Sequence, residues 1–374
     1  MRNILVKGVA AGAIALLSLT ACASERSQTP AGDTGASAGA TGAAQGFAAD
    51  SLIGVALPSK TSENWVLAGD LFTNGLKEAG FTSDVQYAGS STTVADQQAQ
   101  ISAMVTKGAK VIVIGATDAA QLSTQAEAAK AAGATVIAYD RLIKNTDAVD
   151  YYIAYDNFKV GQLQGQALLD GMKAKKADGP YTIELFSGSS DDNNSAVFFD
   201  GAMDVLKPKI DDGTVVVGSG QTDVKQTATD GWKAENAQRR MDSLLTSTYG
   251  SKALDGVLSP NDTLARAIIT SVKGAGKDLP VVTGQDSEVE SVKSIVAGEQ
   301  YSTINKDTRE LVKQTIQMAK DLQAGKQPQV NDTKSYNNGV KVVPSYLLEP
   351  LIVTKENVVE AYANDPKLAP LTKE

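Results

Sequence analysis

Short apolar runs alternate with longer amphipathic stretches from residue 51 onward. The first runs are rich in Val and Ile and show no alternation of polar and apolar positions; they are 52–58, 84–89, 110–117, 134–140 and 151–156. Stretches with helical apolar spacing separate them, such as 67–80, where Gly80 is placed to end a helix. Runs without alternation indicate strands buried on both faces, and therefore parallel sheets covered by helices.

A second series of apolar runs follows the first, at 181–188, 214–220, 254–260, 279–286 and 301–304. The stretch from residue 50 to residue 374 is longer than one hydrophobic core usually serves, so two similar α/β lobes are predicted. Ligands of open parallel sheets bind beyond the carboxyl ends of the strands. Two lobes that face each other would place all these strand ends around one cleft.

Polar side chains follow nearly every predicted strand. They are Lys60, Asn64, Trp65, Thr117, Asp118, Asp140, Arg141, Asp191, Asp192, Asn193, Asn194, Asn261, Asp262, Gln285, Asp286, Asn305 and Lys306. Asp and Asn are also good helix N-caps, so each such position has a structural explanation. For Asp118, Asn193 and Asp262 the capping role is the favoured interpretation.

Capping does not explain Lys60, Arg141 or Lys306, because cations at helix N-termini oppose the macrodipole. It does not explain Trp65 in a loop either. A hydroxyl donates once and accepts twice, so a carboxylate and a cation or amide satisfy it together. The apolar face of a sugar ring packs on an indole. This mixture of side chains therefore predicts a site for a neutral sugar.

The N-terminus reads as an export signal. Arg2 and Lys7 precede the apolar stretch 8–19, which is short for a membrane span. The sequence Leu-Thr-Ala-Cys that ends at Cys22 resembles the bacterial lipobox. We therefore expect a signal peptide over 1–21, acylation of Cys22 and a flexible tether over 22–49. The predicted location is the outer face of the cell membrane, or the periplasm of a Gram-negative cell.

Composition excludes several classes of protein. The net charge is −8, with no His and one Cys, which argues against nucleic-acid binding, the usual zinc and copper sites, and His-dependent nucleophilic catalysis. The acidic stretches 189–194 and 331–339 lack the ligand spacing of a calcium loop. We expect no metal and no cofactor.

Longer stretches carry a family resemblance. They include "MVTKGAKVIVI", "VIAYDRLI", "YDNFKVG", "IELFSGSSDDNN", "VLSPNDTLA", "GQDSEVESVKSI", "AGEQYSTINKDTREL" and "NDTKSYNNGVKVVPSYLL". The chain from residue 51 onward resembles type I periplasmic sugar-binding proteins of the ribose/galactose/xylose-binding group. Within that group it is most similar to ChvE-type multiple-monosaccharide receptors.

This resemblance implies an α/β fold of two Rossmann-like lobes with parallel sheets, joined by a three-stranded hinge. The crossings are expected near Asp156-Asn157, Ile304-Asn305 and Val343-Pro344, with Asp156, Asn157 and Asn305 as hinge residues. The N-terminal lobe would comprise 50–156 plus 305–343, and the C-terminal lobe 157–304 plus 344–374. Members of the family close on their ligand by a hinge motion.

The resemblance also implies roles for individual residues. Asp140 and Arg141 match the pair that binds ring and anomeric oxygens, and Asn261 and Asp286 match ligands of sugar hydroxyls. Lys306 takes the polar position at the hinge-side strand end.

Other matches are less direct. Lys60 and Trp65 lie where relatives place a polar residue and a stacking aromatic, and Asn64 replaces an Arg of ChvE-type sequences. Asp192 and Asn194 lie where ribose binders carry an Arg. Asp118 completes the predicted sugar-binding set. Phe198 and Phe199 have two possible roles, as pocket wall or as core.

The function implied is that of a substrate-binding lipoprotein of an ABC sugar importer. It would bind aldoses of the glucose, galactose, arabinose and xylose type and deliver them, as a monomer, to a permease and its ATPase subunit. The alternative is a sugar-sensing co-receptor for a chemoreceptor or a sensor kinase. Glycoside hydrolysis by paired carboxylates is the enzyme alternative. It is disfavoured because each candidate carboxylate has a binding role: Asp118, Asp140, Asp191, Asp192 and Asp286.

Overall fold

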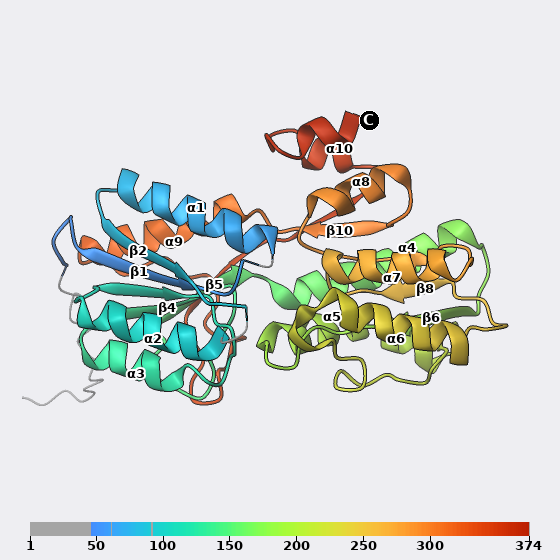
Figure 1. Cartoon of the computed structure of the whole chain (residues 1–374), viewed down its shortest axis with the longest axis horizontal. Coiled ribbons are helices and arrows are strands. Elements are labelled where there is room, and N and C mark those ends of the chain that lie inside the picture. The colour runs from blue at the N-terminus through green and yellow to red at the C-terminus, as the bar shows by residue number, and fades with distance from the viewer. Residues whose placement is uncertain (1–45, 61, 91–92, 374) are drawn as a thin grey trace, which may run out of the picture. The chain divides into compact units, whose positions relative to one another are not determined.

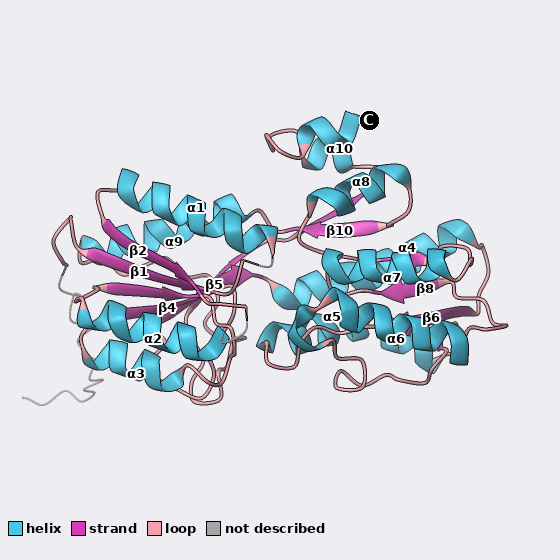
Figure 2. Cartoon of the chain, in the orientation of Figure 1, coloured by secondary structure: helices cyan, strands magenta, loops and turns pink. Residues whose placement is uncertain are grey.

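The computed structural model describes residues 46–60, 62–90 and 93–373. The predicted signal peptide, the acylation site Cys22 and most of the tether lie outside these residues. In the described part, helices and strands alternate and build two lobes, each with a parallel sheet (Figures 1 and 2). The predicted α/β class with parallel sheets is confirmed.

The first lobe contains a six-stranded parallel sheet in the order β11-β5-β4-β3-β1-β2. Its strands are β1 (Leu52–Leu57), β2 (Thr82–Tyr87), β3 (Val111–Ile114), β4 (Thr135–Tyr139), β5 (Tyr151–Tyr155) and β11 (Ser345–Leu348). Its helices are α1 (Glu63–Glu78), α2 (Thr93–Thr106), α3 (Ser123–Ala131) and α9 (Thr308–Gln323).

Helices cover both faces of this sheet, α1 and α9 on one and α2 and α3 on the other (Figure 1). Strand β3 shows why its sequence is continuously apolar. Val111 and Val113 pack under α1 and α9, whereas Ile112 and Ile114 pack under α2 and α3. Because successive strand residues point to opposite faces, a strand covered twice needs apolar side chains at every position.

The second lobe contains a four-stranded parallel sheet in the order β7-β6-β8-β9. Its strands are β6 (Tyr181–Leu185), β7 (Val215–Val217), β8 (Gly256–Leu258) and β9 (Val281–Val282). Helices α4 (Asn157–Lys175) and α5 (Asn193–Asp211) cover one face, and α6 (Ala234–Ser247) and α7 (Asp262–Gly274) cover the other. A short 3-10 helix, Asp230–Trp232, precedes α6.

A smaller group of elements, separate from the two parallel sheets, surrounds a two-stranded sheet. Strands β10 (Ser302–Asn305) and β12 (Leu351–Thr354) pair antiparallel, and α8 (Val289–Ala297) packs with α10 (Val358–Ala361) and the 3-10 helix Ala369–Lys373. The C-terminal segment also reaches the first lobe, through ion pairs of Asp365 with Arg309 and of Lys367 with Glu63.

At two of the three predicted crossings, elements of different lobes adjoin in the chain, and these two crossings stay predictions. Strand β5 ends at Tyr155 and α4 begins at Asn157, and β10 ends at Asn305 shortly before α9. The third prediction, at Val343-Pro344, is wrong. Residues 345–348 form β11, which pairs in register with β5 at the edge of the first sheet, so the chain leaves this lobe only after Leu348. Residues 344–348 therefore belong to the first lobe.

Candidate functional site

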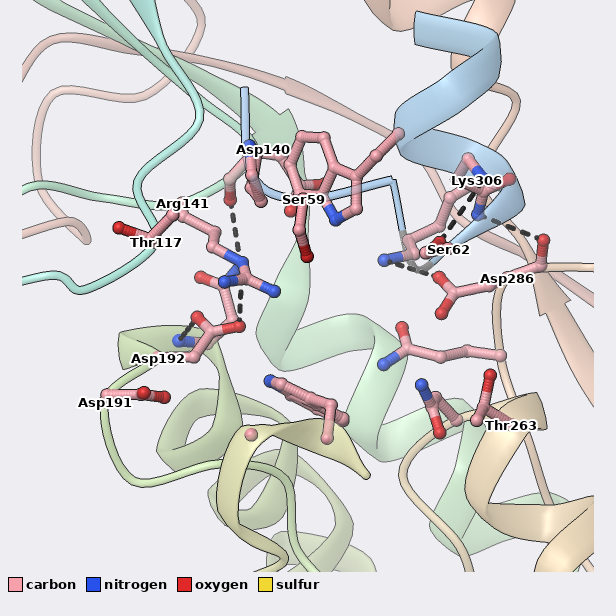
Figure 3. A pocket seen from close by; sticks show the side chains of 18 of the residues that line it. Ser59, Ser62, Thr117, Asp140, Arg141, Asp191, Asp192, Thr263, Asp286 and Lys306 are labelled. Carbon is pink, nitrogen blue, oxygen red and sulfur yellow. Dashed lines mark hydrogen bonds and ion pairs between the residues drawn. The ribbon is translucent and has the colours of Figure 1, made fainter. Parts of the chain in front are cut away.

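A cavity of about 760 Å³ lies where the carboxyl ends of both parallel sheets meet. Both lobes and the crossing at Lys306 line it (Figure 3). The first lobe contributes residues that follow β1, β3 and β4, and the second lobe contributes residues that follow β6, β8 and β9. The expected convergence of strand ends on one cleft is thus what the structure shows.

The first turn of α1 presents Asn64 and Trp65 to the cavity. Ser62 caps this helix, since its hydroxyl accepts a hydrogen bond from the Asn64 backbone N–H at 3.3 Å. The Trp65 ring meets Tyr139 edge-on, with centroids 6.0 Å apart. Gly115 leaves room for it, because a Cβ there would lie 3.0 Å from the indole. Packing therefore fixes Trp65 as one wall of the cavity.

Asp140 follows β4 directly and has a left-handed backbone, with φ of 61°. Its carbonyl oxygen accepts hydrogen bonds from the Tyr152 hydroxyl at 2.7 Å and from Asn194 Nδ2 at 2.8 Å. Burial raises the pKa of its carboxyl group, against the opposing effect of the nearby Lys306 and Arg141. The fold thus holds a carboxylate at a position where ionisation is disfavoured.

Arg141 pairs with a carboxylate of the second lobe. Its Nε lies 3.0 Å from Asp192 Oδ2, and the two side chains are 16% and 3% exposed (Figure 3). Asp192 also caps α5, through Oδ1 and the Asn194 N–H at 3.0 Å. The Arg141 guanidinium lies 5.5 Å from the centroid of the Trp65 ring. Arg141 thus has a fixed orientation without a ligand.

Lys306 and Asp286 form a second ion pair, with Nζ 3.2 Å from Oδ1. Burial lowers the pKa of Lys306, but the carboxylates of Asp286 and Asp140 outweigh this effect and raise the pKa above that of an ordinary lysine. Asp286 has φ of 97°, and its carbonyl oxygen accepts a hydrogen bond from Asn64 Nδ2 at 3.2 Å. A second cation and carboxylate are therefore held together at the cavity.

Trp232 forms a wall contributed by the second lobe. It ends a 3-10 turn with φ of 55°, and its ring lies against Gly188, where a Cβ would come within 2.1 Å of the indole. Its Nε1 is buried and has no hydrogen-bond partner among the described residues, and the same is true of Gln285 Oε1. Buried polar atoms are usually paired, so these two atoms are exceptions among the residues that line the cavity.

Nine predicted sugar-binding residues line the cavity: Asn64, Trp65, Asp140, Arg141, Asp192, Asn194, Asn261, Asp286 and Lys306. Two do not. The Lys60 ammonium lies over the Tyr87 ring, 4.5 Å from its centroid. Asp118 accepts hydrogen bonds from the backbone of Ala120 and Gln121, at 2.8 and 3.0 Å, which is the capping role weighed against the sugar role. Both are removed from the candidate site.

The two phenylalanines divide between the proposed roles. Phe198 lines the cavity, 5.4 Å from Lys306 Nζ, whereas Phe199 packs in the core of the second lobe. Sequence reasoning missed Trp232, because the chain runs far past β7 before reaching it. An isolated Trp beside a Gly in a polar stretch was the available signal.

No metal site or membrane-spanning helix emerges from the described ranges. Within 46–60, 62–90 and 93–373, no three or more His, Cys, Asp or Glu side chains group in a way that could hold a metal ion. In that same part of the chain, no helix combines the length and apolar character needed to cross a bilayer.

Comparisons with known proteins agree with this geometry. The chain is 51% identical over 320 residues to the multiple sugar-binding periplasmic receptor ChvE of Rhizobium radiobacter, covering 84% of this chain and 90% of the relative. It is 47% identical to the multiple sugar-binding periplasmic protein SbpA of Azospirillum brasilense, covering 82% and 86%. These relatives are binding proteins, so the prediction that the chain is not an enzyme is confirmed.

A solved structure extends the likeness to three dimensions. An ABC transporter solute-binding protein from Clostridium phytofermentans with bound β-D-glucose superimposes with a TM-score of 0.81 at 41% identity, covering 84% of this chain and 98% of the other. Residues 53–327 match the sequence profile of the periplasmic binding protein domain. The family resemblance seen in the sequence is confirmed: the chain belongs to the periplasmic binding protein family.

Proposed function

We propose that the chain binds aldose monosaccharides of the glucose type in this cavity and serves as the substrate-binding subunit of an ABC sugar importer. One observation carries the proposal: two indole walls, Trp65 and Trp232, enclose a cavity lined by carboxylates, cations and amides of both lobes. The names of its relatives support the ligand class, since two bind multiple sugars and one solved relative holds glucose.

The polar groups match what sugar hydroxyls need. The carboxylates of Asp140 and Asp286 accept hydrogen bonds, and the cations of Arg141 and Lys306 donate them. The Asn261 Oδ1 already accepts the Leu264 N–H at 3.0 Å, so its amide NH₂ is the group that faces a hydroxyl. The ion pairs hold these groups in place before a ligand arrives, which lowers the entropy cost of binding.

Lobe closure is the proposed mechanism of capture. A sugar that contacts Trp65 and Arg141 on one lobe, and Trp232 and Asn261 on the other, favours the arrangement in which both sets reach it. The crossings at Asp156-Asn157 and Asn305, the proposed hinge, are where the backbone would turn. The closed form would then be delivered to a permease and its ATPase subunit.

The chain is further proposed to be exported and held at the outer face of the cell membrane by acylated Cys22. The support is the lipobox sequence and the small-residue tether that follows it. Cys22→Ala should release the chain from the membrane fraction and abolish incorporation of labelled palmitate. Retention of the variant in the membrane fraction would refute the lipid anchor.

Isothermal titration of the purified full-length chain with glucose, galactose, arabinose and xylose tests the ligand, with maltose as a control for size. Several aldoses should bind, and Asp140→Asn should weaken them by about a hundredfold. Asn is chosen because it tolerates the left-handed backbone at this position, whereas Ala would add strain. Absence of heat with every monosaccharide would refute the ligand class.

Transport is tested separately from binding. Vesicles that contain the cognate permease and ATPase should take up labelled glucose only with this chain and ATP. Binding without uptake would favour the alternative role, presentation of sugar to a chemoreceptor or sensor kinase through the same cavity.

A further inference from the structure

One backbone carbonyl and three side chains beside the cavity form a closed ring of hydrogen bonds. The Asp140 carbonyl oxygen accepts from the Tyr152 hydroxyl at 2.7 Å and from Asn194 Nδ2 at 2.8 Å. Asn157 Nδ2 closes the ring, since it donates to the Tyr152 hydroxyl oxygen at 3.1 Å and to Asn194 Oδ1 at 3.0 Å. We call these four residues the Asp140 ring.

Donors and acceptors match around the whole ring. The Asp140 carbonyl uses both lone pairs, and the Tyr152 hydroxyl donates its one proton while accepting another. Both protons of Asn157 Nδ2 are used, and Asn194 donates from one end of its amide and accepts at the other. Tyr152 is 0% exposed, and Asn157 and Asn194 are each 2% exposed. A buried network with every bond made is rigid, whereas a single missing member leaves unpaired polar atoms.

The ring joins both lobes at their crossing. Asp140 and Tyr152 belong to the end of β4 and to β5 of the first lobe, and Asn194 lies in α5 of the second. Asn157 is the first residue of α4, where the chain passes between them. Tyr336 supports this corner: its hydroxyl accepts the Asn157 backbone N–H at 3.2 Å, and its ring packs on Tyr152 with centroids 5.0 Å apart.

Asp140 needs such support because its backbone is left-handed, with φ of 61°. This conformation is uncommon for a residue with a side chain and persists where the surroundings fix it. The ring holds the Asp140 carbonyl by two bonds and so fixes the backbone from which the carboxylate of the same residue projects. The carboxylate lines the cavity.

We propose that Tyr152, Asn157 and Asn194 are positioning residues that hold Asp140 in its sugar-binding orientation and tie that orientation to the arrangement of the two lobes. The inference rests on the proposed function. It gives Asn194 a role beside the one expected from the sequence, because its amide oxygen and one of its two N–H groups already bond Asn157 and Asp140. Asn194 acts on the sugar through Asp140.

Tyr152→Phe is the sharpest test, since it removes the hydroxyl and keeps the ring that packs on Tyr336. Glucose affinity is measured by isothermal titration in the wild-type and Asp140→Gly backgrounds. Gly adopts φ of 61° without strain and removes the carboxylate. Tyr152→Phe should weaken binding about tenfold in the wild-type background and less than twofold in the Asp140→Gly background. NMR titration extends both measurements to millimolar dissociation constants.

A matched control separates positioning from general loss of stability. Tyr249 is equally buried and lies away from the cavity. Its hydroxyl donates to Glu184 Oε1 at 2.6 Å and also lies 3.0 Å from Ile183 O. Tyr249→Phe should lower the melting temperature as Tyr152→Phe does, yet leave glucose affinity unchanged. Asn194→Ala should weaken binding as Tyr152→Phe does.

The outcomes distinguish the two proposals. If the wild-type chain binds no monosaccharide, the proposed function and this inference both fail. If the wild type binds and Tyr152→Phe has no effect, or costs the same in both backgrounds, the positioning role is refuted while the function stands. If Asp140→Gly abolishes all binding, the cycle is run in the Asp140→Asn background. Tyr152→Phe should then cost about tenfold in the wild type and less than twofold in the Asp140→Asn background.

Discussion

The two lobes present their cavity side chains in different ways. In the first lobe, Trp65 lies on the first turn of a capped helix, and Asp140 and Arg141 follow a five-residue strand directly. In the second lobe, Trp232 and Asp286 lie in irregular segments with left-handed backbones, and the strands before them have only two or three residues. The two indole walls therefore differ, because Trp65 rests on a regular helix and Trp232 rests on a short irregular turn.

The lobes also differ in charge at the cavity. The second lobe contributes the carboxylates Asp192 and Asp286, while the first lobe and the crossing contribute the cations Arg141 and Lys306. Asp192 and Asp286 thus each pair with a cation from outside their own lobe. Neither lobe therefore carries a complete site. Removing one member of such an ion pair leaves an unpaired charge on the other side of the cavity.

The largest effect is expected from Arg141→Ala. It leaves the buried Asp192 carboxylate without its cation, and breaking a buried pair from one side costs about 3 kcal/mol of folding stability. Sugar affinity should fall more than a hundredfold. Urea denaturation and isothermal titration measure the two losses. The double variant with Asp192→Asn should regain most of the stability but not the affinity; equal stability of the single and double variants would contradict the pairing argument.

Small substitutions under the two tryptophans compare the walls directly. Gly188→Ala places a Cβ within 2.1 Å of the Trp232 ring, whereas Gly115→Ala places one 3.0 Å from the Trp65 ring. Overpacking of the first kind costs about 1–3 kcal/mol, and if this cost falls on the sugar-bound form, Gly188→Ala should weaken glucose binding at least about fivefold. Gly115→Ala should cost about twofold to threefold. If Gly115→Ala reduced glucose affinity more than Gly188→Ala does, the expectation that the Trp232 wall is the more tightly packed would be wrong.

Asp140→Asn should separate stability from binding. Burial raises the pKa of this carboxyl in the folded chain, so folding favours its protonated form and stability is lost as pH rises through that pKa. Replacing it by a neutral amide should raise the melting temperature of the unliganded chain at pH 7 by about 2 °C, while sugar affinity falls. The gain should shrink as the pH drops through the raised pKa and vanish below the ordinary pKa of an aspartate. Calorimetry from pH 3 to pH 8 measures it; a gain independent of pH would exclude ionisation as the cause.

The smallest effects are expected outside the cavity. Lys60→Ala removes a cation lying over the Tyr87 ring, and Asp118→Asn alters a turn, so neither should change glucose affinity by more than about twofold. Isothermal titration compares both with the wild type. A tenfold loss in either variant would return that residue to the site.

The sequence predicted the first lobe's part of the site better than the second's. Apolar runs ended where the strands end, so Asp140 and Arg141 could be placed at the rim from their position alone. Trp232 could not, because its approach to the cavity depends on a left-handed turn and on the missing side chain of Gly188. Such details arise from tertiary contacts and leave no periodic signal.

The Asp140 ring was equally out of reach of sequence reasoning. The sequence predicts a sugar contact for Asn194, but its bonds to Asp140, Tyr152 and Asn157 depend on three segments distant in the chain. The third crossing was misplaced for a related reason. The apolar residues 345–348 and 351–354 look alike in the sequence, but they pair with different sheets.

The edge strand β11 has a consequence for the order of folding. Residues 345–348 pair with residues 152–155, so the first sheet stays incomplete until almost the whole chain is available. The second lobe's sheet, in contrast, is built from one continuous stretch, residues 181–282. Contacts between residues so distant in sequence form slowly, and β5 presents an unpaired strand edge meanwhile. We therefore expect the first lobe to complete its sheet after the second, which pulse-labelling hydrogen exchange during refolding would measure.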